Sequence, residues 1–363
     1  MIVSEPGRAR FPSRLLAVVA AALMIGASLA VRSFVIEDDQ GGGGSGDRRV
    51  TLRMACAAEL RSACEAVASG DVEIVVEPAG ETETRLTSAA DADEAGIDAW
   101  LAYAPSVAIV ADARERAGLD PILGVPGEPL ARSPIVLVAR ADRADALRGS
   151  CGGEVTWACL GDAAGKPWPD AGGQETWGRV RPAHGHPRVT GDGLLGLGHA
   201  VGTYLATDEI APDDVSRLDW ETSDTFPGWF QRLERSIPTD AFDGRDPFTR
   251  FLQTRLRAYD FVATTEAAAT TGLARSAPDV RDAATVLYAA PVATADVVLA
   301  PVGDADLGDL AGDLRDALAD AGFRVGGDPL PGAAGAPDLP DTDGLPSPGA
   351  LIALRDYWED VVR

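Results

Sequence analysis

The segment at residues 189–205, VTGDGLLGLGHAVGTYL, places glycines at positions 191, 193 and 196. This G-x-G-x-x-G spacing is typical of dinucleotide sites, where a buried strand turns tightly into a helix and an acid follows about twenty residues later. Here the preceding residues are RPAHGHPRV, and the next acids lie in the polar stretch TDEIAPDD. Both requirements fail, so the sequence argues against a dinucleotide site.

The glycines still predict a tight turn over residues 190–193 that opens an apolar helix over 194–205. The first N–H groups of a helix have no partner within it and can bind an acceptor-rich ligand. Two interpretations remain open. Either Thr190 or Asp192 only caps the helix, or the glycines let a ligand approach the backbone closely. The second interpretation makes ligand contacts of Thr190, Gly191, Asp192 and Gly193.

Other residue types that do chemistry form no recognisable pattern. His184 and His186 could place both rings on one side of an extended segment, but no thiol or acid lies at ligand spacing. The sequence has no G-x-S-x-G, and GDAAGK at 161–166 is one residue too short for a phosphate loop. We therefore expect no catalytic residue, no metal site and no cofactor, and we do not predict an enzyme.

Four cysteines stand in two pairs of equal spacing, Cys56 with Cys64 and Cys151 with Cys159. An even count in an exported chain suggests disulfides, although four cysteines allow three connectivities. Zinc sites usually have closer spacing, and neither pair has it. Local pairing is the simplest assignment, and four buried free thiols are the alternative.

The N-terminal residues predict export. An uncharged run at 15–31, LLAVVAAALMIGASLAV, follows a flank with three arginines and precedes GGGGSG at 41–46. A basic flank before an apolar run is typical of a signal peptide or of a single membrane anchor, and the run is near the minimum length for a spanning helix. We assign residues 1–36 to a signal peptide or membrane anchor and 37–48 to a Gly-rich linker. The rest is expected to be extracytoplasmic, held to the cytoplasmic membrane by this N-terminal helix if it is not cleaved.

The net charge of −24 restricts the partners. So acidic a surface repels nucleic acid and anionic lipid, and we expect no nucleic-acid binding.

Beyond residue 48 the pattern alternates between apolar strands and amphipathic helices. Short β-branched runs flanked by helices are typical of an α/β fold with a largely parallel sheet. The aromatic residues over 220–251 are expected to pack in a core, with a sugar-stacking surface as the alternative. The expected strands are 50–55, 72–77, 99–103, 135–140, 285–288 and 296–300, and the clearest helices are 59–68, 81–89, 106–117, 306–321 and 351–362.

This order resembles the type II extracellular solute-binding proteins that feed bacterial ABC importers, with molybdate-binding-like members the nearest in style. The similarity is carried by LARSPIVLVAR at 130–140, VTWACLGDAAG at 155–165, the glycine segment, YDFVATTEAA at 259–268 and TVLYAAPVATADVVLAP at 285–301. It implies a two-lobed α/β fold in which each lobe is a mostly parallel sheet flanked by helices. Lobe one would comprise 49–133 plus 291–363 and lobe two 134–290, joined by crossings at IVLVAR and TVLYAA.

The resemblance also implies a ligand cleft between the lobes, lined by loops that follow the strands. Asp192 and Glu266 would bring negative charge to this cleft, which argues against a doubly charged anion unless they point away. Carried over by position, the ligand-binding residues are Ala57, Ala58, Pro105, Ser106, Ser133, Thr190, Gly191, Asp192, Gly193, Thr264, Thr265 and Glu266.

Two functions follow from the resemblance. The first is a receptor that closes on a small polar solute and delivers it to an ABC permease. The second is a membrane-anchored extracellular sensor or interaction protein that keeps the fold without transport. The sequence identifies neither the solute nor the partner.

Overall fold

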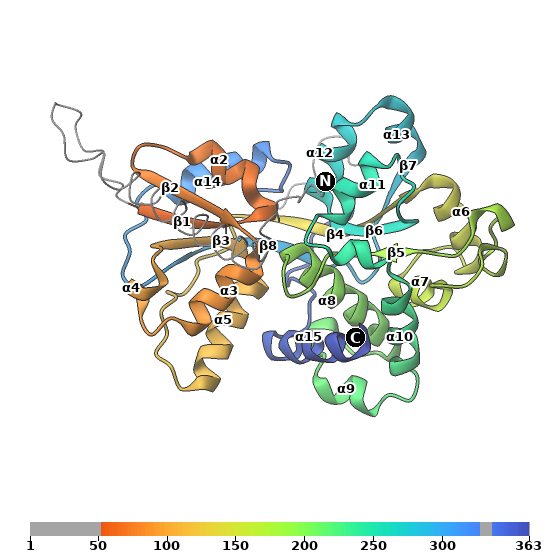
Figure 1. Ribbon diagram of the computed structural model, residues 1–363, viewed down its shortest axis with the longest axis horizontal. Coiled ribbons are helices and arrows are strands. Elements are labelled where there is room, and N and C mark those ends of the chain that lie inside the picture. The colour runs from red at the N-terminus through yellow and green to blue at the C-terminus, as the bar shows by residue number, and fades with distance from the viewer. Residues whose placement is uncertain (1–51, 327–335, 363) are drawn as a thin grey trace, which may run out of the picture. The chain divides into compact units, whose positions relative to one another are not determined.

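The computed structural model describes residues 52–326 and 336–362 (Figure 1). The predicted signal or anchor segment and the Gly-rich linker lie outside these residues. Contacts divide the chain into two units, Met1–Arg48 and Arg49–Arg363, and the fold described below belongs to the second. In the described part of the chain, no helix combines the length and apolar character needed to cross a membrane.

Lobe one is built on three parallel strands and one antiparallel strand. The strand β1 (Leu52–Ala57) lies between β2 (Val72–Glu77) and β3 (Ala99–Tyr103), parallel to both. The strand β8 (Thr294–Pro301) pairs with β3 in the opposite direction. Every residue of β3 is buried, which accounts for its continuous apolar run AWLAY.

Helices cover both faces of this sheet (Figure 1). On one face α2 (Arg61–Val67) packs against α14 (Leu310–Asp320), and on the other α3 (Ala79–Ser88) packs against α5 (Ala104–Ala117). The short helices η1 (Ala58–Leu60) and α4 (Ala92–Ala95) complete the lobe.

The strand β4 (Ala131–Arg140) joins the two lobes. Its first residues pair with β8, and its later residues pair with β6 (Phe261–Thr265) on one side and β7 (Ala284–Leu287) on the other. The short strand β5 (Pro182–Ala183) runs parallel to β6. In each lobe three strands therefore share one direction and the connecting strand opposes them, so the predicted two-lobed, mostly parallel α/β fold is confirmed.

Helices also flank the sheet of lobe two. The helices α11 (Pro247–Gln253), α12 (Glu266–Arg275) and α13 (Pro278–Ala283) lie above it in Figure 1, and α7 (Trp157–Ala163), α8 (Gly191–Leu205) and α10 (Phe226–Ser236) lie below. The helices α6 (Ala141–Ser150) and α9 (Arg217–Thr222) lie at its periphery. Trp220, Phe226, Trp229 and Phe230 are buried, which confirms the expectation that this aromatic run packs in the core.

The second connection between the lobes lies later than the sequence predicts. The predicted crossing TVLYAA contains most of β7, but β7 pairs with β4 inside lobe two, from Leu137 opposite Leu287 to Arg140 opposite Ala284. The chain crosses through residues 288–293 and then enters β8. The apolar β-branched residues of β7 are explained by this pairing with a buried strand.

The C-terminal helix α15 (Pro348–Val362) contacts both lobes. Its Leu354 and Trp358 belong to the apolar core of lobe two, and its Arg355 pairs with Glu83 of α3 in lobe one at 2.7 Å. The proposed boundaries place this helix with lobe one, whereas its apolar face is shared mainly with lobe two.

Both predicted disulfides are confirmed. Cys56 is bonded to Cys64 with the Cα atoms 6.4 Å apart, and Cys151 to Cys159 with the Cα atoms 5.8 Å apart. The first bond lies between β1 and α2, and the second connects the residue after α6 to α7.

We predict that replacing Cys151 and Cys159 together by alanine lowers the free energy of unfolding by about 2–3 kcal/mol, because the short crosslinked loop restricts the unfolded chain. Denaturant unfolding of the parent and the variant without reductant measures the difference. Reductant should lower the stability of both proteins, because Cys56–Cys64 remains in each, and should remove most of the difference between them. Equal stability without reductant would contradict a structural role for this bond.

Candidate functional site

The predicted turn at the start of α8 is built by Thr190 and Gly193. Thr190 has extended backbone, and its Oγ1 accepts a hydrogen bond from the Gly193 amide at 3.1 Å, as in a helix N-cap. A Cβ at Gly193 would lie 2.5 Å from the backbone carbon of Gly185. Gly193 therefore permits close packing of two backbone segments within lobe two.

The first amide of α8 holds a carboxylate from the other lobe. Glu59, in η1 directly after β1, accepts a hydrogen bond from the Gly191 amide through Oε1 at 2.5 Å. A Cβ on Gly191 would lie 2.7 Å from Cδ2 of Tyr103, so glycine is required for this approach. Acceptor binding at the helix N-terminus was predicted from the sequence, but Glu59 itself was not.

A second contact joins the lobes beside the first. Tyr103, the last residue of β3, donates a hydrogen bond from its hydroxyl to Oδ1 of Asp192 at 3.0 Å. The Thr265 hydroxyl lies near Tyr103 and opposes the rise in its pKa. The Thr264 hydroxyl lies near Asp192 and has the same effect on its pKa. Glu59, Tyr103, Asp192, Thr264 and Thr265 thus form one cluster, which we call the interlobe cluster.

The electrostatics of the interlobe cluster disfavour negative charge. Burial raises the pKa of Glu59, although its own amide and those of Gly191 and Asp192 oppose the shift. Burial also raises the pKa of Asp192 well above its usual range, and the nearby Glu59 and Asp246 carboxyls raise it further. The pKa of Tyr103 rises for the same reasons, first burial and then the charges of Asp192 and Glu59.

Several buried polar atoms of the described residues have no hydrogen-bond partner, and two of them belong to this cluster. They include Oε2 of Glu59 and Oγ1 of Thr264, whose hydroxyl lies near Asp192 without making a hydrogen bond of ordinary geometry. The Ser106 hydroxyl, in the first turn of α5 after Tyr103, is also unpartnered and fully buried. Buried polar groups are nearly always satisfied in native proteins, so these atoms need an explanation.

The remaining predicted residues lie nearby in other roles. Ala57 ends β1, Ala58 begins η1, and Pro105 lies in the first turn of α5. Ser133 Oγ accepts the Ala267 amide at 3.0 Å, and Thr265 Oγ1 accepts the Ala268 amide at 3.2 Å, so both hydroxyls satisfy the start of α12.

Glu266 differs from the expectation of a ligand contact. Arg324 donates to Oε1 at 2.8 Å and to Oε2 at 2.5 Å, and the Tyr288 hydroxyl donates to Oε2 at 2.7 Å. Both carboxylate oxygens are therefore used inside the protein. The partner Arg324 follows α14, too far along the chain for the sequence to have indicated the pair.

The two neighbouring histidines do not share a ligand. His184 is fully buried and contacts both carboxylate oxygens of Glu234 at 3.2 Å, and the Trp358 indole also donates to Glu234. His186 packs its ring against Trp358. Within residues 52–326 and 336–362, no group of three or more His, Cys, Asp or Glu side chains is arranged to hold a metal ion.

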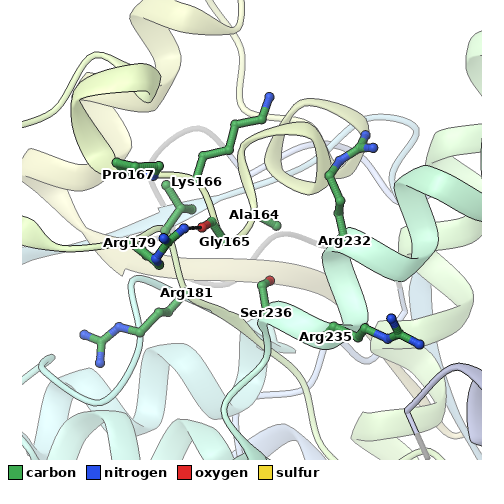
Figure 2. A pocket seen from close by; sticks show the side chains of 10 residues that line it. Ala164, Gly165, Lys166, Pro167, Arg179, Arg181, Arg232, Arg235 and Ser236 are labelled. Atoms are coloured by element: carbon green, nitrogen blue, oxygen red, sulfur yellow. Dashed lines mark hydrogen bonds between the residues drawn. The ribbon is translucent and has the colours of Figure 1, made fainter.

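Lobe two also contains a cavity of about 630 Å³ lined by cationic side chains (Figure 2). Its cations are Lys166, Arg179, Arg181, Arg232 and Arg235. In Figure 2 their charged ends point in different directions; Arg179 bonds to the Gly165 carbonyl and Arg232 to Asp162. Because this cavity belongs to one lobe and its cations do not converge, we do not place the functional site there.

Comparison with known proteins defines the fold. No family model and no curated protein matches the sequence. The periplasmic binding protein AfuA from Actinobacillus pleuropneumoniae, solved with fructose-6-phosphate, superposes with a TM-score of 0.55 and 11% identity, covering 86% of this chain and 98% of that one. The chain has the fold of the two-lobed periplasmic solute-binding proteins.

Two further solved periplasmic binding proteins have this fold. A periplasmic thiamin binding protein gives a TM-score of 0.51 at 15% identity, with 89% of this chain and 99% of that chain covered. Iron-bound HitA from Pseudomonas aeruginosa gives 0.50 at 14% identity, with coverage of 86% and 99%. The predicted similarity to solute-binding proteins is confirmed at the level of fold, but nothing in these comparisons supports the molybdate-like style.

We predict that Asp192→Asn raises the melting temperature at pH 7.5. A carboxyl whose pKa is raised by folding stabilises the protein fully below its usual value, 3.8 for Asp, and loses that contribution as the pH rises through the raised pKa. The difference from the parent should therefore vanish near pH 4, where the parent's Asp192 is protonated.

The exposed Asp316 of α14 provides the control, because Asp316→Asn removes one charge away from the cluster and should show no such pH dependence. An Asp192→Asn protein less stable than the parent at pH 7.5 would mean that the folded protein stabilises the Asp192 carboxylate.

Proposed function

We propose that this protein is an extracytoplasmic receptor that binds a small polar solute between its two lobes and delivers it to an ABC permease. The observation that carries the proposal is the interlobe cluster, in which Glu59 and Tyr103 of one lobe contact Gly191 and Asp192 of the other. Glu59 follows β1 and Tyr103 ends β3, and the carboxyl ends of strands are the usual position of a ligand in such folds.

The unpartnered atoms support binding at this position. Oε2 of Glu59 and the hydroxyls of Ser106 and Thr264 are buried but free to accept or donate. A solute enclosed by the two lobes would supply the missing hydrogen bonds, which makes its binding favourable relative to the empty site. The fold is shared with proteins solved with fructose-6-phosphate and with iron, so it accommodates chemically different solutes.

The two disulfides and the predicted export segment support an extracytoplasmic location. Disulfides persist in oxidising environments outside the cytoplasm. We propose that the described part of the chain functions there, either released or held by the N-terminal segment, and that it needs no catalytic residue.

One observation favours the sensor as a second candidate. The lobes contact each other directly, and α15 holds both through Arg355 with Glu83 and Trp358 with Glu234. Such direct contact between the lobes suits signalling to a partner as well as transport. An ATPase and a permease encoded beside the gene would favour transport, and their absence would favour the sensor.

The proposal is tested first by thermal-shift screening of the full chain with oxyanions, sugars, amino acids and polyamines. A receptor should show a saturable rise in melting temperature with one class, because a ligand that binds only the folded state stabilises it. Failure of every class would contradict solute binding.

Closure is tested at Gly80, in the first turn of α3. Its amide donates to the Val189 carbonyl in lobe two at 3.1 Å, and a Cβ would lie 1.9 Å from the Arg188 carbonyl oxygen. We predict that Gly80→Ala holds the lobes apart, with a larger radius of gyration in X-ray scattering. Affinity for a solute found in the screen should fall at least about tenfold, since the competent state is less populated.

Gly312→Ala is the matched control, because Gly312 is an exposed glycine of α14 with open space around its Cα. It should leave both scattering and affinity unchanged. A Gly80→Ala protein that binds as tightly as the parent would show that binding does not need the lobes to close.

A further inference from the structure

We propose that the solute is a small organic cation whose ammonium group binds between Glu59 and Asp192. This inference rests on the proposed solute-binding function of the interlobe cluster and specifies its ligand class. Three independent features of the described residues support it: the pairing of buried acids, the balance of hydrogen-bond donors and acceptors, and the number of metal-ligating groups.

The protein pairs its most buried carboxylates with cations. A buried charge is costly unless a partner compensates it, and each fully buried acid in the described part of the chain has such a partner. The pairs are Glu83 with Arg355, Glu234 with His184, Asp260 with Arg143, Glu266 with Arg324, and Asp296 with Arg132.

The interlobe cluster brings together two acids that have no such partner. Glu59 and Asp192 are partly buried and close enough to act on each other, yet neither forms an ion pair. The exposed Asp246, which caps α11, adds a third negative charge that repels the carboxylates of Glu59 and Asp192. Among the described residues, the positive counterpart is the N-terminus of α8, which carries about half a unit charge. A cation is the missing partner.

The hydrogen-bond balance gives the same result. The Gly191 amide donates to Glu59, the Gly193 amide to Thr190, and the Tyr103 hydroxyl to Asp192, so these three donors are already used. The Thr264 hydroxyl remains as a donor that has no hydrogen-bond partner. The buried Glu59 Oε2 remains as an acceptor without a donor. An oxyanion brings only acceptors, whereas an ammonium brings up to three N–H donors and a charge.

An organic cation fits better than a metal ion. Hard divalent cations take about six or more oxygen ligands, usually with several carboxylates. The described residues contain no group of three or more His, Cys, Asp or Glu side chains arranged for a metal. Two carboxylates and nearby hydroxyls are sufficient for one ammonium group.

The raised pKa values describe the same cluster without its cation. Burial raises the pKa of Glu59 and Asp192, with each carboxyl and Asp246 adding to the effect, and Tyr103 shares it. A bound cation would compete with protons for both carboxyls. Its affinity should therefore weaken as the pH falls from 7.5 toward 4.5.

The test is isothermal titration and thermal shift of the full chain with probes of similar shape and different charge. The probes are butylamine and 1,4-diaminobutane as cations, 1-butanol as neutral, butyrate and molybdate as anions, and calcium and iron(III) as metals, all at constant ionic strength. We expect saturable binding by the amines only.

Saturable binding by the neutral or anionic probes alone, or by the metals alone, would overturn the inference while leaving solute binding intact. Binding by no probe in this set would also overturn it, and a negative result in the broader screen would then reject the proposed function too.

Two charge-removing variants locate the binding. Glu59→Gln and Asp192→Asn keep the shape of each side chain, and each should weaken amine binding by about ten- to a hundredfold, since charged hydrogen bonds are about twice as strong as neutral ones. Circular dichroism checks that each variant folds, and the two positions give independent tests.

The control for general attraction in so acidic a chain is Asp316→Asn, which removes one exposed charge of α14. Its amine affinity should equal that of the parent. Equal losses in all three variants, or no loss in Glu59→Gln and Asp192→Asn, would show that the amines bind elsewhere or through the overall charge, and would overturn the inference.

Discussion

The hydrogen bond from the first amide of α8 to the Glu59 carboxylate sets the geometry of the interlobe region. It places the Glu59 carboxyl, which follows β1 in lobe one, beside the Asp192 carboxyl in the first turn of α8 in lobe two. Burial and mutual repulsion disfavour their ionisation, while helix amides and the Tyr103 hydroxyl partly offset this. Two of the buried polar atoms that have no hydrogen-bond partner, Oε2 of Glu59 and Oγ1 of Thr264, lie in the same region. The lobes therefore meet at an arrangement that an additional positive group would complete.

The strands that connect the lobes contrast with this arrangement, because the buried acids beside them form ion pairs with arginines. Arg132, at the start of β4, pairs with Asp296 of β8 at 2.8 Å, and Arg324 pairs with Glu266 at the start of α12. Buried pairs of this kind cannot separate without leaving a charge in the interior. They fix how β4 and β8 pass between the lobes, whereas Glu59 and Asp192 lie at the direct contact between the lobes.

The sequence predicted those features of the fold and the site that depend on residues close together in the chain. The strand and helix order, both disulfides and the turn that Thr190 caps follow from patterns within about twenty residues. Glu59 was missed and Glu266 was assigned to the ligand because their partners lie far along the chain. Gly191 is 132 residues from Glu59, Asp192 is 89 from Tyr103, and Arg324 is 58 from Glu266. Only the docking of the two lobes and the path of residues after α14 determine these pairs, and no local pattern encodes them.

The disulfide between Cys56 and Cys64 encloses Glu59 in a short covalent ring. If Glu59 takes the solute, its carboxylate is held in position only after this ring has closed. A newly made chain in a reducing cytoplasm would carry the same residue on an open loop and would pay more conformational entropy to order it. The bond would then act as a maturation step, so that the protein acquires its affinity after export and does not compete for solute inside the cell that produces it.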